Sequence, residues 1–141
     1  MIPSAIYEKF STDNYLTTQC GITTSRVVEL QSVDQRPFDD GSFIVLNWQE
    51  SSTYGVLLRA PRVLTVWVHS PLDRGRDYRI LDKILNRIDG ILLSLEQFKG
   101  TDNVRITCVN KLGRSGNLID EGWKTIARNA TYRVLYDETT T

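Results

Sequence analysis

The feature that most constrains the fold is a series of apolar residues spaced three and four apart. This spacing places them on one stripe of a helix, which must pack against another element to exclude water. We predict a helix over residues 78–98, with Asp73 as its N-cap and its end near Gly100. The apolar stripe consists of Leu81, Ile84, Leu85, Ile88, Ile91, Leu92 and Leu95. The polar face, whose own charges support the helix little, carries Arg79, Asp82, Lys83, Asn86, Arg87, Asp89 and Glu96.

Several shorter segments have the length and alternation of β-strands. Residues 43–48 are apolar on both faces, which predicts a strand in the interior of a sheet. Residues 63–69 alternate, with Leu64, Val66 and Val68 on one face and Val63, Thr65, Trp67 and His69 on the other. Further strands are predicted over residues 26–30, 54–58, 103–110 and 125–136. Trp48 and Trp67 are expected in the core.

A polar stretch with three glycines separates the last two predicted strands. Residues 103–110 alternate so that Val104, Ile106 and Cys108 share one face. Residues 110–122 then predict a long polar loop, and loops of this length are often functional. The order of elements predicts an α+β fold, in which a mostly antiparallel β-sheet packs against one long amphipathic helix and ends in a long β-hairpin.

The chain of 141 residues has the length of a single domain. Residues 1–25 are polar and rich in threonine, so we expect a weakly structured segment, with a short helix at residues 5–10 and a second turn starting at Asp13. The polar tail, residues 137–141, is expected to fray. The sequence shows no signal peptide and no apolar run near the ~20 residues of a membrane span, so we expect a reducing cytosol and no membrane contact.

The formal net charge is zero, with 17 Lys and Arg against 17 Asp and Glu. This argues against binding nucleic acid through a global positive field. Basic residues nevertheless gather at Arg59, Arg62, Arg74, Arg76 and Arg79. Acidic residues lie in loops and in the tail, at Asp34, Asp39, Asp40, Asp120, Glu121, Asp137 and Glu138. Separate basic and acidic patches suit head-to-tail assembly into a ring, and the alternative is that these arginines are only solvated or paired.

No catalytic constellation is recognisable. His69 is the single histidine, so nucleophilic catalysis would have to use it, and a hydrogen-bonded structural histidine is the expectation. Phosphate-binding glycine loops do not occur. Cys20 and Cys108 lack the spacing of a zinc site, and Cys108 is expected as a small core residue. We therefore predict no enzyme activity, no cofactor and no metal.

The order of elements also resembles a known family. The resemblance rests on four segments: residues 62–71, the helix 78–98, residues 104–109 and the final stretch from Arg128 to Tyr136. Over residues 43–136 they resemble the tail terminator proteins of long-tailed, siphovirus-type bacteriophages. The resemblance implies a virion protein, assembled in the host cytoplasm, that forms a homohexameric ring on the head-proximal end of the tail tube. The ring would stop tube polymerisation and present a surface to head-completion proteins such as the stopper, while DNA passes through its lumen without sequence readout.

On this interpretation, exposure and charge suggest the contact residues. Subunit contacts are assigned to Arg59, Arg62, Arg74 and Arg76. Contacts with the tube or the head are assigned to two loops, at Arg36, Phe38, Asp39, Asp40, Lys111, Arg114, Asn117, Asp120 and Trp123. Two alternatives stay open: another head–tail connector, such as a stopper, and a small soluble domain that binds a small molecule or nucleic acid. Stoppers tend to be all-β and adaptors mainly helical, so the helix beside several strands favours the terminator.

Overall fold

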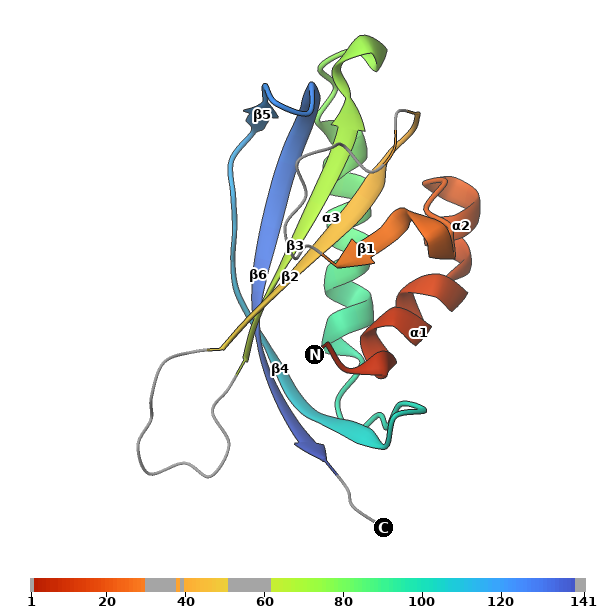
Figure 1. Ribbon diagram of the computed structural model, residues 1–141, viewed down its shortest axis with the longest axis vertical. Coiled ribbons are helices and arrows are strands. Elements are labelled where there is room, and N and C mark those ends of the chain that lie inside the picture. Colours follow the sequence, from red (N-terminus) through yellow and green to blue (C-terminus); the bar gives the residue numbers. More distant parts are fainter. Residues whose placement is uncertain (1, 30–37, 39, 51–61, 139–141) are drawn as a thin grey trace.

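The fold consists of a single sheet with helices on one face (Figure 1). The computed structural model describes residues 2–29, 38, 40–50 and 62–138. The elements are α1 (Ser4–Thr12), α2 (Asn14–Gln19), η1 (Thr24–Arg26), β1 (Val27–Glu29), β2 (Phe43–Glu50), β3 (Arg62–Pro71), η2 (Leu72–Arg74), α3 (Arg79–Leu93), β4 (Val104–Arg114), β5 (Leu118–Asp120) and β6 (Thr125–Glu138).

The sheet is mostly antiparallel, as predicted. Its strand order is β1-β2-β3-β6-β4, and β5 pairs with β6 beyond the end of β4. Only β1 and β2 run parallel among the described pairs. β2 lies between β1 and β3, which confirms the interior strand predicted from its apolar character. The strand predicted at residues 54–58 lies outside the described residues.

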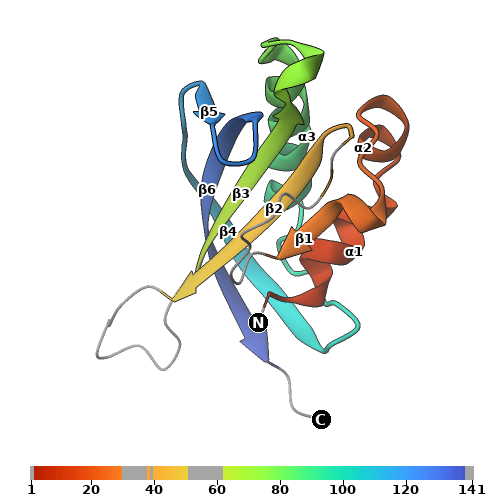
Figure 2. The same ribbon diagram turned by 45° about the horizontal axis from the view of Figure 1, so that its top comes forward.

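The helices and the inner face of the sheet enclose the core (Figure 2). Leu64, Val66 and Val68 of β3 are buried there, as their alternation predicts. All seven residues of the predicted apolar stripe are buried as well. Trp48 is partly buried against this core, whereas Trp67 is partly buried on the opposite face of the sheet.

The predicted start of α3 agrees with the structure to within one residue, but the predicted N-cap and the predicted end are wrong. Asp73 lies in η2, and α3 begins only at Arg79, with Tyr78 at the N-cap position and no side-chain cap. The helix ends at Leu93, because the following segment turns to pair with β4. Phe98 accepts a backbone hydrogen bond from Ile106 at 2.9 Å, and the Gly100 amide donates to Val104 at 3.0 Å.

Residues 2–25 contain two helices that pack against the core, in place of the weakly structured segment expected from the sequence. The short helix and the second turn expected there are present as α1 and α2. The Asp13 carboxylate caps α2 by accepting a hydrogen bond from the Leu16 amide at 3.0 Å. Residues from this segment complete the core on the helical face: Ile2, Ala5, Ile6, Phe10, Leu16 and Ile22.

A β-bulge in β4 overturns the predicted burial of Cys108. Ile106 pairs with Tyr136 and Cys108 with Leu135, so one extra residue lies in β4 between these two pairs. The extra residue moves Val109, in place of Cys108, onto the core face. Cys108 is consequently only partly buried.

The stretch predicted as a long polar loop is mostly strand. β4 continues to Arg114, which pairs with Ala130 of β6. β5 then continues the antiparallel pairing with β6, beginning with Leu118 opposite Ala127. Only residues 115–117 interrupt the edge. A short turn closes the hairpin, in which the Trp123 amide donates to Asp120 Oδ1 at 3.0 Å. We call residues 118–124 the hairpin tip.

Candidate interaction site

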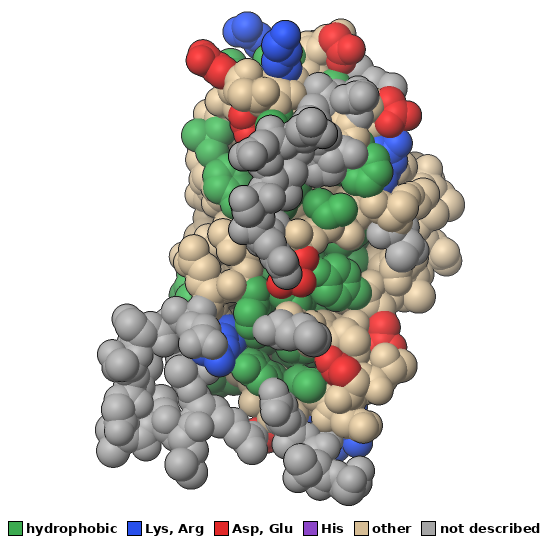
Figure 3. Space-filling model, viewed as in Figure 1, with side chains coloured by type: hydrophobic (Ala, Val, Ile, Leu, Met, Phe, Trp, Pro, Cys, Tyr) green, Lys and Arg blue, Asp and Glu red, His purple; other side chains and the backbone are tan. Residues whose placement is uncertain are grey.

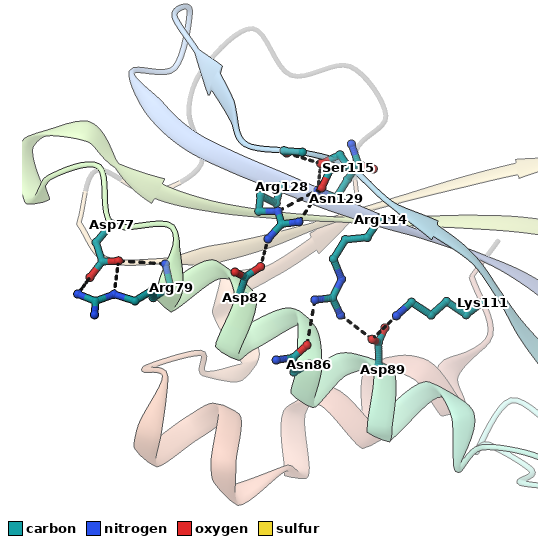
Figure 4. A network of polar contacts seen from close by, with 11 residues as sticks. Asp77, Arg79, Asp82, Asn86, Asp89, Lys111, Arg114, Ser115, Arg128 and Asn129 are labelled. Atoms are coloured by element: carbon teal, nitrogen blue, oxygen red, sulfur yellow. Dashed lines mark hydrogen bonds and ion pairs between the residues drawn. The ribbon is translucent and has the colours of Figure 1, made fainter.

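Polar contacts tie the hairpin to the exposed side of α3 (Figure 4). Asp89 accepts from Lys111 Nζ at 2.9 Å, from Arg114 Nη2 at 2.5 Å and from the Tyr132 hydroxyl. Arg114 Nη1 also donates to Asn86 Oδ1 at 2.9 Å. Lys111 and Arg114, predicted to lie in a partner-binding loop, therefore hold β4 against the helix.

Arg128 holds the segment of residues 115–117, between β4 and β5, in place. Its Nε and Nη2 donate to the Ser115 carbonyl at 3.2 and 2.8 Å, and its Nη1 pairs with Asp82. The Asn129 amide donates to Ser115 Oγ at 2.9 Å. We call Asp82, Asn86, Asp89, Lys111, Arg114 and Arg128 the hairpin clamp.

Within the hairpin clamp, the charges and hydrogen bonds around Asp89 shift its pKa and that of Tyr132. The Asp89 side chain is only 15% exposed. This burial alone would raise its pKa, but hydrogen bonds from Lys111 and Tyr132 and the charge of Arg114 hold the pKa below its ordinary value. Burial and the neighbouring Asp89 carboxylate raise the pKa of Tyr132. Asp89 of α3 is therefore a charged acceptor shared by donors from β4 and β6.

The sheet face away from the helices carries an aromatic cluster. The Phe43 ring stacks on the His69 ring at 5.0 Å between centroids, and the Trp123 ring lies 5.0 Å from His69. Phe38 lies 5.8 Å from Phe43. His69 is buried and hydrogen-bonded, with Nδ1 2.8 Å from Thr125 Oγ1. The cluster thus anchors the hairpin tip to β2 and β3 through Trp123.

A pocket of about 470 Å³ lies between this cluster and the hairpin tip. It is lined by Trp67, His69, Leu118, Ile119, Asp120, Glu121 and Ala127. Leu118 and Ile119 are 39% and 45% exposed. Figure 3 shows this face of the sheet, where hydrophobic side chains reach the surface among polar ones. The pocket combines aliphatic and aromatic surface with two carboxylates, which suits a cationic and apolar segment.

Sequence reasoning missed the role of Leu118 and Ile119. The signal was an adjacent pair of large aliphatic residues within an otherwise polar stretch. Only the pairing of β5 with β6 shows that Leu118 and Ile119 lie beside the rings of Trp67 and His69.

The arginines assigned to subunit contacts do not form a single patch. Arg62 begins β3, whereas Arg74 and Arg76 follow its end. A ten-residue strand spans roughly 30 Å, so these positions lie at opposite ends of the sheet. The Arg62 Nε donates to the Tyr136 hydroxyl at 3.2 Å, and Arg76 is exposed. Arg59 lies outside the described residues.

The remaining predicted contact residues are scattered. Asp40 forms an ion pair with Arg26 at 3.0 Å, and the Arg26 guanidinium lies over the Phe38 ring. Asn117 is exposed in the interruption between β4 and β5. Asp120 and Trp123 belong to the hairpin tip. Arg36 and Asp39 fall in the part of the chain that is not described.

The described residues hold no group of three or more His, Cys, Asp or Glu side chains suited to a metal ion. None of the helices in the described ranges is long and apolar enough to span a membrane. Cys20 and Cys108 are free thiols.

The one-sided sheet defines a fold class that occurs in virions. A chain from the virion of a native gene transfer agent particle matches with a TM-score of 0.59 at 13% identity, covering 93% of this chain and 90% of that chain. A second solved structure matches with a TM-score of 0.58 at 14% identity, covering 96% and 94%. The TM-scores over most of both chains show a shared fold, and at these identities they show the fold alone. No family model and no curated protein matches the sequence.

Proposed function

We propose that the protein is a structural component of a phage-type virion and, more specifically, a tail terminator. In this role it forms a ring on the head-proximal end of the tail tube, stops polymerisation and provides the surface that joins the head. The observation that carries the proposal is the fold shared with a gene transfer agent virion chain over nine-tenths of both chains. The family resemblance drawn from β3, α3, β4 and β6 adds to it.

The geometry is consistent with a steric mechanism. A ring subunit needs a rigid body and two different lateral surfaces, because a heterologous contact joins unlike patches of neighbouring copies. The hairpin clamp supplies rigidity by fixing the hairpin to α3. The hairpin tip offers one exposed surface of mixed apolar and acidic character. Binding to the last tube ring without presenting a copy of that ring would end polymerisation.

The expected partners follow from this role. The protein would contact itself, the tail tube protein and a head-completion protein. DNA would pass through the ring without sequence-specific contacts, in agreement with a net charge of zero.

Deletion of the gene from its virus or virus-like element tests the role directly. A terminator predicts abnormally long tails, and a plasmid copy should restore normal length. Tails of normal length with unstable filled heads would instead indicate a stopper. Purified protein added to tail tubes should give six-fold rings at one end in electron micrographs, and a strictly monomeric protein that never joins tails would overturn the proposal.

A further inference from the structure

Two oppositely charged features lie at the same end of the molecule. Figures 1 and 2 place β5 and the turn between β3 and α3 together at the top of the sheet. Contacts agree with this, because the Tyr78 hydroxyl donates to the Leu118 carbonyl at 2.8 Å and the Leu72 amide donates to the Lys124 carbonyl at 3.0 Å. The two features therefore lie at the same height along the direction of the strands.

The acidic feature is the pocket of the hairpin tip. Asp120 uses Oδ1 to accept from the Trp123 amide, which fixes the turn. Glu121 is exposed, and within the described chain its carboxylate has no ion-pair partner. Beside these carboxylates lie Leu118, Ile119 and Trp67. A guanidinium beside an aliphatic side chain would satisfy both parts of this surface.

The basic feature is the segment of residues 76–80. The Arg79 guanidinium and amide bind Asp77 at 3.0 Å, so that carboxylate is already occupied. Arg76 is exposed and has no ion-pair partner among the described residues. Ile80, in the first turn of α3, is 39% exposed. The segment thus presents a cation and an aliphatic side chain at its surface.

The two features face different sides of the sheet. The pocket lies on the sheet face away from the helices, around Trp67 and His69. Residues 76–80 lead into α3, which covers the other face. Back-to-front contact between copies would therefore bring unlike surfaces together at one level, the arrangement that a closed ring requires.

We propose that the pocket of the hairpin tip receives residues 76–80 of a second copy of this chain, with Glu121 facing Arg76 and with Leu118 and Ile119 facing Ile80. This inference rests on the proposed ring and names its subunit contact. The complementary charges belong to the same neutral chain, which favours a second copy over an unrelated partner.

Charge reversal across the contact tests it. Glu121→Lys and Arg76→Glu should each weaken self-association by about tenfold or more, measured by analytical ultracentrifugation, because each places like charges together. The combined variant should return to within about threefold of the parent chain. Glu96→Lys and Arg105→Glu change charges that are also exposed but lie elsewhere, and they should leave association unchanged.

A second readout separates this contact from the terminator role. A mixture of Glu121→Cys and Arg76→Cys chains, both carrying Cys108→Ser, should form intermolecular disulfides in solution and on purified tails. Association and crosslinking without tail binding would contradict the terminator role and support the contact. If Glu121→Lys and Arg76→Glu each still cap tails and self-associate as strongly as the parent chain, the proposed contact is wrong and the terminator role still holds. A parent chain that stays monomeric alone and on tails would overturn the contact as well.

Discussion

The middle and the tip of one hairpin use their charges in opposite ways. At the contact with α3, the largely buried Asp89 side chain accepts hydrogen bonds from Lys111, Arg114 and Tyr132. At the tip, Glu121 is exposed and lies beside exposed aliphatic side chains. The hairpin is thus fastened to α3 in its middle and presents an outward surface at its tip.

This difference separates residues that hold the fold from residues available for contacts. A largely buried carboxylate shared by two cations is costly to remove, since Arg114 in particular would be left mostly buried without its partner. An exposed carboxylate contributes little to folding and can serve a partner at no structural cost. Substitutions in the clamp should therefore act on stability, and substitutions in the tip on assembly.

The largest expected effect comes from Asp89→Ala. The change leaves Arg114, Lys111 and the Tyr132 hydroxyl without their common acceptor. We expect the free energy of unfolding to fall by about 3 kcal/mol in urea denaturation. Glu96→Ala removes an exposed carboxylate close to the same helix and should cost less than about 0.5 kcal/mol. Equal losses in the two variants would contradict the clamp.

Arg128→Ala should have the next largest effect. It removes the donors to Ser115 and the partner of Asp82, so the loss should be about 2 kcal/mol. Amide exchange should accelerate mainly in residues 115–120, because these depend on Arg128 for their place beside β6. Arg105→Ala, at an exposed position of β4, is the matched control. Uniform acceleration along the whole hairpin would contradict a local role.

The pH dependence of stability should sharpen the same distinction. Because the pKa of Asp89 is lowered in the folded protein, its contribution is complete above the ordinary aspartate value of about 4 and is lost as the pH falls through the lowered value. The parent chain should therefore lose more stability on acidification below about pH 4 than Asp89→Asn does. Identical slopes in acid denaturation of the two proteins would refute the coupling at Asp89.

The smallest effect on stability is expected for Glu121→Lys. The residue is exposed, so the free energy of unfolding should change by less than about 0.5 kcal/mol. Calorimetry should show an unfolding temperature close to that of the parent chain while self-association weakens. A destabilisation as large as that of Asp89→Ala would show that the tip belongs to the scaffold.

Periodicity predicted the parts of the fold that depend on local sequence. The stripe from Leu81 to Leu95, the alternation in β3 and the interior position of β2 all follow from side-chain spacing. The N-terminal segment was undervalued, because its many threonines conceal Ile6, Phe10 and Leu16, which complete the core.

The errors concern features that long-range contacts decide. A single extra residue before Cys108 reversed the faces of β4, and only pairing with β6 specifies where the bulge lies. Glycines made residues 110–122 look like a loop, yet β6 and Arg128 hold most of them in the sheet. Likewise, Lys111 and Arg114 looked available for partners, because their bond to Asp89 joins residues more than 20 positions apart.

Hydrogen–deuterium exchange, measured on the free protein and on assembled particles, shows directly which segments of the chain become covered on assembly. We expect residues 118–124 and 72–80 to become protected on assembly, while residues 104–114, already fastened to α3, keep their exchange rates. New protection confined to residues 104–114, with the hairpin tip unchanged, would contradict the division between an internal clamp and an outward-facing tip.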